Sequence, residues 1–289
     1  MLNRLIASRG FVKTVEVLPP RSAEPGAGHG SADLAPYAEE LRNVASHFDG
    51  IQIAEQGGRS RRRFGSVAAA VALKRATPTL ELAPTLSSMG RSRESLEESI
   101  RSTMRAGVDN IILVWGDRPP GEPAQRTTSE VPRVSELISL ARAAQSEMDV
   151  RDLCILAPIN LPRLGDPKYL ETVRGRERAT ADVFLSQPYV GEPESYLLLL
   201  DRLRSEGVRT PVLHDVFPLL SREDAVRMSQ RWGFGVPRKA LEELRESGRA
   251  AGLRRARAFL EALESDSRRV DGVYISSRGE PELALGLVR

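Results

Sequence analysis

The chain has 289 residues, 40% of them hydrophobic and 28% charged, and a formal net charge of +3. This composition is ordinary for a globular protein that buries a full core. The basic excess is small and dispersed, which argues against nucleic-acid binding. A single cysteine, Cys154, excludes a disulfide framework and a thiolate zinc site. No stretch approaches the roughly 18 apolar residues of a membrane span, and residues 1–10 lack the apolar segment of a signal peptide, so we expect a cytoplasmic protein without a membrane partner.

Apolar runs of strand length recur along the chain, each followed by a stretch with helical spacing. In chain order the predicted strand and helix pairs are 12–18 and 33–47, 50–54 and 65–76, 80–84 and 92–106, 110–115 and 131–147, 153–158 and 166–178, 181–187 and 193–206, 210–216 and 221–232, and 272–277 and 280–287, with an extra helix near 237–264 before the last strand. In the stretch 92–106, Leu96 and Ile100 lie four residues apart on one helix face, and Ser92 is the predicted N-cap.

Eight strands that alternate with helices, several of them almost continuously apolar, indicate a parallel sheet covered on both faces. Eight such units over residues 1–289 fit one α/β domain, a (β/α)8 TIM barrel. A doubly wound sheet is the alternative. It requires a glycine-rich fingerprint after the first strand, where this sequence reads "EVLPPRSAEPG".

In a barrel of this kind the active site is built at the carboxyl ends of the strands. Polar side chains fall at or near the end of every predicted strand, and some of them are expected to be simple caps. They are Glu16; Glu55 and Gln56; Thr85, Ser87 and Ser88; Asp117; Asn160; Gln187; His214 and Asp215; and Ser276, Ser277 and Arg278.

Two of these carboxylates are the main catalytic candidates. Glu16 interrupts an apolar strand, where burial raises the pKa of a carboxyl group and makes it a candidate proton donor, unless it pairs with an arginine. Asp117 directly follows a buried strand in "ILVWGDRPPG", either as a turn residue or as a functional acid aimed by Gly116 and the prolines. The basic run "RSRRR" at 59–63 is a candidate site for an anionic ligand such as a phosphate, or else a solvated face.

Several segments resemble the methylenetetrahydrofolate reductase family, in the family's order and across nearly the whole chain. They are "VEVLPPR" at 15–21, "AGVDNIILVWGDRPPG" at 106–121, "DVFLSQPYV" at 182–190, "VLHDVFPL" at 212–219, "GFGVP" at 233–237 and "DGVYISSRG" at 271–279. The resemblance implies a (β/α)8 barrel that reduces the methylene bridge of a folate, or of a related pterin, to a methyl group by hydride transfer.

The resemblance also implies roles for individual residues. Glu16 corresponds to the acid that protonates the pterin-side nitrogen, and Asp117 to the carboxylate that holds the pterin and favours the cationic intermediate. Gln187 corresponds to a pterin-binding amide, and Tyr189 and Arg278 are expected to contact the substrate as well.

The flavin positions of the family are mostly replaced. Where typical members have a Thr after the second strand, a His after the third and an Arg before the Gly-Asp, this chain has Ala54, Thr85 and Trp115. An acid-and-His segment after the fifth strand is here "INLPR" at 159–163. Cofactor contacts are therefore expected at Ala54, Gln56, Thr85, Ser87, Trp115 and Asn160, with NAD(P)H as hydride source and FAD bound weakly or not at all.

Two other functions stay open from the sequence. One is a non-reductive folate- or pterin-binding subunit that works with a methyltransferase or an electron-transfer partner. The other is a phosphate-sugar barrel enzyme, which would need glycine-rich phosphate loops that are lacking after the seventh and eighth strands. The choice between NADH and NADPH, the pterin type and a homo-oligomeric state are not determined by the sequence.

Overall fold

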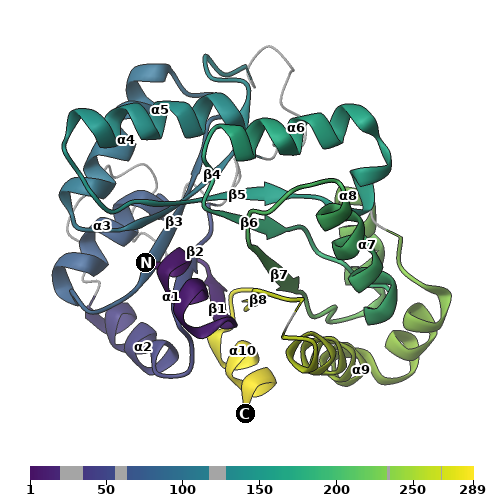
Figure 1. Cartoon of the computed structure of the whole chain (residues 1–289). Helices are drawn as coiled ribbons and strands as arrows, with labels where there is room; N and C mark the ends of the chain where they lie inside the picture. Colours follow the sequence, from purple (N-terminus) through teal and green to yellow (C-terminus); the bar gives the residue numbers. More distant parts are fainter. Residues whose placement is uncertain (20–34, 56–63, 117–127, 233–234, 268) are drawn as a thin grey trace.

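A computed structural model describes residues 1–19, 35–55, 64–116, 128–232, 235–267 and 269–289. Eight parallel strands pair in sequence order and close into a barrel, which confirms the predicted fold (Figure 1). The strands are β1 (Val12–Val17), β2 (Gly50–Ile53), β3 (Leu82–Ser87), β4 (Asn110–Val114), β5 (Cys154–Ile159), β6 (Val183–Ser186), β7 (Val212–Val216) and β8 (Gly272–Ser276). The pairing of β8 with β1 completes the closure.

The helices surround this barrel on the outside (Figure 1). They are α2 (Ala35–Ala45), α3 (Ser66–Ala76), α4 (Arg93–Arg105), α5 (Val134–Glu147), α6 (Pro167–Arg178), α7 (Pro193–Ser205), α8 (Arg222–Trp232), α9 (Arg238–Ser265) and α10 (Pro281–Val288). Ser92 caps α4 as predicted, because its hydroxyl accepts a hydrogen bond from the Ser95 N–H. The extra helix before the last strand is α9.

Two elements were not predicted. Helix α1 (Leu2–Arg9) lacks a side-chain cap and is short, so it gives a weak sequence signal. It is held by tertiary packing, since Leu2 and Ile6 are buried against the residues that fill the inside of the barrel. A short 3-10 helix, η2 (Leu161–Gly165), follows β5 within the segment expected to be a loop.

Strand β3 also differs from its predicted range, 80–84. It begins at Leu82 and continues to Ser87, so Thr85 and Ser87 are strand residues rather than loop residues. The reason is that Thr85 and Ser87 pair in register with Ile112 and Val114 of β4, and this pairing extends the strand past the apolar run.

Along each strand, successive side chains point alternately into two apolar clusters, one between the strands and the helices and one inside the barrel. In β5, Ile155 and Ala157 pack outward against the helices, while Cys154 and Leu156 point into the barrel. Both faces are therefore dry, which explains why the strands read as continuous apolar runs. Cys154 is fully buried, and burial raises the pKa of its thiol to about 12, so it is an inert core residue, as predicted.

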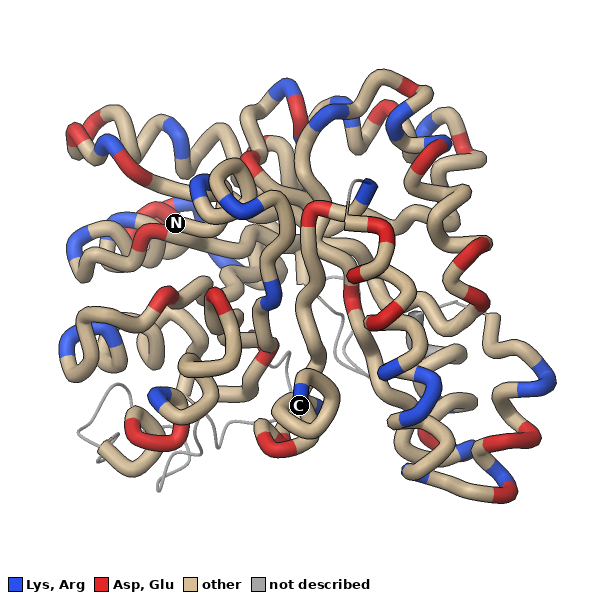
Figure 2. The backbone as a smooth tube through the Cα atoms, turned by 60° about the horizontal axis from the view of Figure 1, so that its bottom comes forward, with Lys and Arg blue, Asp and Glu red and all other residues tan. Residues whose placement is uncertain are grey.

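Charges are spread widely over the outside. In Figure 2, Lys and Arg segments are interspersed with Asp and Glu segments along the helices. The basic run 59–63 lies outside the described residues. None of the described helices is long and apolar enough to cross a membrane.

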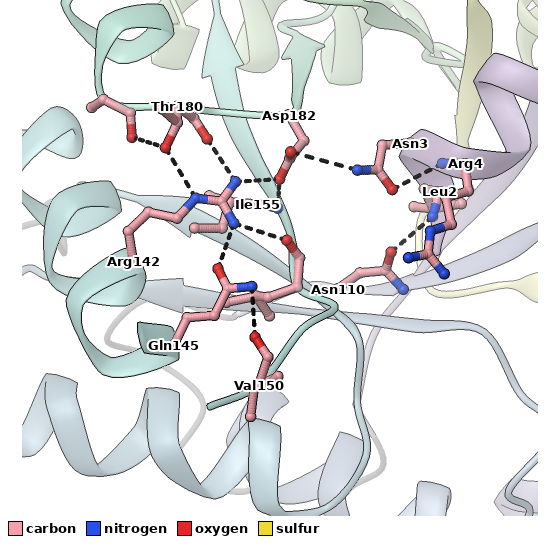
Figure 3. A network of polar contacts seen from close by, with 12 residues as sticks. Leu2, Asn3, Arg4, Asn110, Arg142, Gln145, Val150, Ile155, Thr180 and Asp182 are labelled. Carbon is pink, nitrogen blue, oxygen red and sulfur yellow. Dashed lines mark hydrogen bonds and ion pairs between the residues drawn. The ribbon is translucent and has the colours of Figure 1, made fainter. Parts of the chain in front are cut away.

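The amino ends of the strands are tied together by a polar network (Figure 3). Arg142 of α5 lies beside Asp182, with Nη2 and Oδ2 2.6 Å apart, and it donates to the carbonyl oxygens of Leu153 and Thr180 at 2.9 and 2.7 Å. The same Asp182 oxygen accepts from the Ile155 N–H at 2.6 Å. This network fixes α5 to the starts of β5 and β6, at the end of the barrel where residues serve stability rather than catalysis.

We expect Arg142→Met to lower the free energy of unfolding by about 1–3 kcal/mol, because it leaves a partly buried carboxylate and two carbonyl groups without their donor. The matched control is Arg105→Met, since Arg105 pairs with Glu98 while both side chains are more than half exposed. Such a pair is worth about 0–1 kcal/mol. Chemical denaturation measures both variants, and equal losses would contradict the structural role of the network.

Candidate active site at the mouth of the barrel

The carboxyl ends of all eight strands open at one end of the barrel, and the predicted site residues gather there. Glu16, Thr85 and Ser87 are at the ends of β1 and β3, while Asn160 and Gln187 directly follow β5 and β6. Ala54, Trp115 and Arg278 directly follow or lie near the ends of β2, β4 and β8. Two predicted residues, Asp117 and Gln56, lie outside the described residues.

The floor of this opening is a single layer of four side chains. In an eight-stranded barrel with a shear number of 8, the residue at the same height on the next strand lies about one position beyond the residue that is paired in register. The inward-pointing residues at one height therefore come from alternate strands and form layers. The strand pairings place four residues in the uppermost layer fully enclosed by strands: Glu16, Thr85, Pro158 and Asp215. The layer beneath consists of buried side chains, namely Gln52, Ile112, Leu185 and Tyr274.

Glu16 is partly buried in this floor, and its surroundings favour the protonated form of its carboxyl group. Burial raises its pKa, while a hydrogen bond from the Ser276 hydroxyl to Oε1 (3.3 Å) and the charge of Arg278 oppose the rise. Among the described residues Glu16 forms no ion pair, because the Arg278 guanidinium is bound to Asp224 instead. Within the described residues, Glu16 is therefore not the ion-pair partner of an arginine.

Arg278 is held in place at the rim by contacts with three residues. Its two terminal nitrogens each donate to a carboxylate oxygen of Asp224 at 2.9 Å, and its guanidinium carbon lies 4.4 Å from the centre of the Phe217 ring. Nη1 also donates to the Pro218 carbonyl at 2.9 Å. The residue adopts a left-handed backbone conformation, with φ of 58°. The positive charge of Arg278 acts on the Glu16 carboxyl group. The contact of Arg278 with the substrate stays a prediction.

His214 and Asp215 are adjacent residues of β7, within the predicted strand, and their side chains face opposite ways. Asp215 points into the barrel, whereas His214 points outward, where its Nδ1 lies 2.7 Å from the Tyr196 hydroxyl. Burial lowers the pKa of His214 to about 3, so its imidazole is neutral at physiological pH. His214 therefore belongs to the packing between β7 and α7, and of the two only Asp215 belongs to the floor.

Gln187 and Asn160 are joined at the rim. The Asn160 amide donates to the Gln187 side-chain oxygen at 3.0 Å, which links the ends of β5 and β6. Tyr189 turns towards the outer helices, with its ring 5.0 Å from that of Tyr196 and 6.3 Å from that of Phe259. Gln187 thus stays at the opening, while the packing of the Tyr189 ring is against α7 and α9.

The expected flavin positions offer few donors for a diphosphate. Ala54 has no polar side-chain atom, the Trp115 side chain is a partly exposed ring, and the Asn160 amide is engaged by Gln187. The Ser87 hydroxyl donates to the Trp115 carbonyl at 3.0 Å. The described residues at these positions therefore do not fit the phosphates of FAD. No group of three or more metal-ligating side chains occurs within the described part of the chain.

Two features of the site were not recognised from the sequence. Asp224, the partner of Arg278, lies in the first turn of α8 and far from Arg278 in sequence, so nothing local marks the pair. The closeness of Asp215 to Glu16 depends on the stagger around the barrel. The alternation of Tyr274 and Ser276 in "GVYISS" is the signal that could have placed hydroxyl groups between them.

Gly116 lets β4 turn sharply into the segment that begins with Asp117. Its φ is +100°, and a Cβ atom built on it would lie 2.0 Å from the Ser87 hydroxyl oxygen. Any residue with a side chain is therefore strained in this backbone conformation, and its Cβ atom has no space.

We expect Gly116→Ala to lower the free energy of unfolding more than Gly107→Ala does. Gly107 also has a positive φ, +71°, but no atom lies within 4 Å of its added Cβ. Gly107→Ala should thus cost only the backbone term of about 1–2 kcal/mol, and Gly116→Ala should add the clash with Ser87. Urea denaturation of both variants tests this, and equal costs would show that Ser87 yields without strain.

Comparison with solved structures supports the fold alone. A 2,3-dimethylmalate lyase of the PEP mutase/isocitrate lyase superfamily matches with a TM-score of 0.56 at 12% identity, covering 99% of this chain and 78% of that one. An oxaloacetate acetylhydrolase in complex with 3,3-difluorooxalacetate gives 0.54 at 13% identity (99% and 81% covered), and a phosphonopyruvate hydrolase complexed with oxalate and Mg²⁺ gives 0.54 at 13% (100% and 83%). No curated protein matches the sequence significantly.

A comparison with protein families gives a more specific result. Residues 1–263 match the family described as methylenetetrahydrofolate reductase. The match covers most of the chain and includes the strand ends that form the floor, from β1 to β7. This chain therefore belongs to the methylenetetrahydrofolate reductase family.

Proposed function

We propose that the chain reduces a methylene-tetrahydrofolate, or a related methylene-pterin, to its methyl form with hydride from NAD(P)H. The observation that carries the proposal is Glu16: a carboxyl group in the floor of the mouth, with a raised pKa and no ion pair among the described residues. It stands at the position that corresponds to the family's acid. A carboxyl group with a raised pKa keeps its proton to higher pH than an ordinary glutamate does and can release it to a substrate.

The proposed chemistry begins with this proton. Glu16 transfers it to one of the two nitrogens that the methylene bridge joins, that C–N bond opens, and the bond electrons remain on the protonated nitrogen. The lone pair of the other bridge nitrogen forms an iminium with the carbon, which then accepts hydride to become a methyl group on that nitrogen. The positive charge of this intermediate is stabilised by carboxylates fixed nearby, and Glu16 becomes such a carboxylate on losing its proton.

Two further residues have proposed binding roles. Gln187, joined to Asn160 through its oxygen, is proposed to hold the pterin with its amide donors. Asp117 is proposed to bind the pterin and favour the cationic intermediate. Its support is the family motif and the sharp turn at Gly116 that precedes it.

Glu16→Gln should lower the rate of methylene reduction by about 10²–10⁴-fold, because glutamine keeps the shape but cannot donate the proton. Binding of the reduced folate should stay within a few-fold of wild type. Steady-state kinetics and equilibrium titration measure the two effects, with Glu98→Gln, a surface substitution on α4, as control. A rate loss below tenfold would contradict the acid role.

FAD is proposed not to be a tightly bound cofactor. The support is the set of side chains at Ala54, Trp115 and Asn160, none of which is charged. We expect Trp115→Arg to tighten FAD binding about 10- to 100-fold, since a bond to a charged group is typically worth about 1.5–3 kcal/mol. Fluorescence titration of wild type and variant measures this, and a wild-type Kd below about 1 μM would contradict the proposal.

The same replacements favour one second candidate, a non-reductive subunit that binds folate for a methyltransferase or an electron-transfer partner. Such a protein would bind reduced folate but would not oxidise NADH or NADPH in its presence. The kinetic assay of the wild-type chain therefore separates the two functions.

A further inference from the structure

The floor of the barrel contains a second carboxyl group, Asp215, beside Glu16. Strand β8 lies between the strands that carry them, and it presents two hydroxyl groups towards the inside. Tyr274 pairs in register with Asp215, and Ser276 pairs in register with Glu16. Asp215 is only 3% exposed, so water does not solvate its charge.

The hydrogens of both hydroxyl groups are committed elsewhere. The Tyr274 hydroxyl donates to the Ser186 carbonyl at 2.5 Å, and the Ser276 hydroxyl donates to Glu16 Oε1 at 3.3 Å. Each hydroxyl has a single hydrogen to give but can still accept. Both side chains belong to the strand next to Asp215, while Oδ1 of Asp215 has no hydrogen-bond partner within the described residues.

Each hydroxyl keeps its hydrogen bond if Asp215 is protonated and is itself the donor. A neutral Asp215 can give its hydrogen to the oxygen of Ser276, whose own hydrogen then points to Glu16. An ionised Asp215 would instead compete with Glu16 for that one hydrogen. It would also leave two negative charges in one enclosed layer, which is costly.

We propose that Asp215 is a positioning residue for Glu16: as a neutral acid it donates to Ser276 Oγ and so directs the Ser276 hydrogen to Glu16 Oε1. With Oε1 engaged as an acceptor, Glu16 carries its own proton on Oε2. That oxygen is the one that gives the proton to the substrate. This last step rests on the proposed function, whereas the protonation of Asp215 does not.

The charges around Asp215 agree with this assignment. Burial and the neighbouring Glu16 raise its pKa well above the ordinary range, and the Tyr274 and Ser276 hydroxyls and the Arg278 charge oppose this only in part. Tyr196 lies on the outer side of β7, next to His214, and burial raises the pKa of its phenol, so it adds no charge near neutrality.

The first test measures protonation directly. Infrared difference spectroscopy of the ligand-free protein at neutral pH should show a buried carboxylic acid band that disappears in Asp215→Asn and persists in Glu16→Gln, beside the separate band of Glu16, which Glu16→Gln removes. If the band is unchanged in Asp215→Asn, Asp215 is ionised and the proposal fails. This result does not depend on the activity of the protein, so it separates this inference from the proposed function.

The second test compares two replacements of Asp215 by the pH profile of reduction. Asparagine can still donate to Ser276, so Asp215→Asn should keep kcat within about threefold and leave the profile in place. Leucine cannot donate, so Asp215→Leu should lower kcat by about 2- to 10-fold, the usual effect of one hydrogen bond. Its alkaline limb should move to higher pH, because the Ser276 hydrogen no longer stabilises the Glu16 carboxylate.

Ser276→Ala completes the comparison. It should move the alkaline limb in the same direction as Asp215→Leu, and the double variant should show no further shift, since both changes remove the same hydrogen bond. Additive shifts, or an Asp215→Asn variant as impaired as Asp215→Leu, would overturn the positioning role. If Asp215→Leu does not fold, Asp215→Asn and the infrared band still decide the question.

Discussion

The constraint on which this site depends is the placement of two carboxyl groups, Glu16 and Asp215, in one enclosed layer of the barrel. Asp215 is almost fully buried and Glu16 is partly buried, so two negative charges cannot be held side by side there at low cost. At least one of the groups must therefore keep its proton. A pair with this property is suited to proton donation, because the structure itself maintains a proton next to the opening where a substrate would bind.

The two ends of the barrel have different tasks. At the amino ends of the strands, Arg142 and Asp182 satisfy backbone groups and hold helix α5 to the sheet. At the carboxyl ends, Arg278 is fixed by Asp224 so that its charge reaches Glu16 without pairing with it. An ion pair with Glu16 would lower the pKa of that carboxyl and make it a poorer acid, so the position of Asp224 serves the chemistry as well as the packing.

The sequence was sufficient for the architecture because both faces of the strands are dry and the helices have regular amphipathic spacing. The carboxylate in β1 was also recognisable, since a lone Glu16 among apolar residues is unusual in a buried strand. Helix α1 escaped prediction because tertiary contacts of Leu2 and Ile6 hold it, not local signals. The role of Asp215 escaped prediction because it depends on barrel stagger, which no single segment encodes.

Typical members of the methylenetetrahydrofolate reductase family, to which this chain belongs, bind FAD, whereas the described residues at the flavin positions do not fit its phosphates. The proposed transfer of hydride directly from NAD(P)H is consistent with both observations. The most direct measurement is to incubate the purified chain, without added flavin, with a methylene-tetrahydrofolate and a reduced nicotinamide deuterated at the transferable position, and to analyse the product by mass spectrometry. The account predicts that the new methyl group carries the deuterium. Unchanged methylene-folate would contradict the reductase function, and a methyl group in which the deuterium has exchanged with solvent would contradict direct hydride transfer.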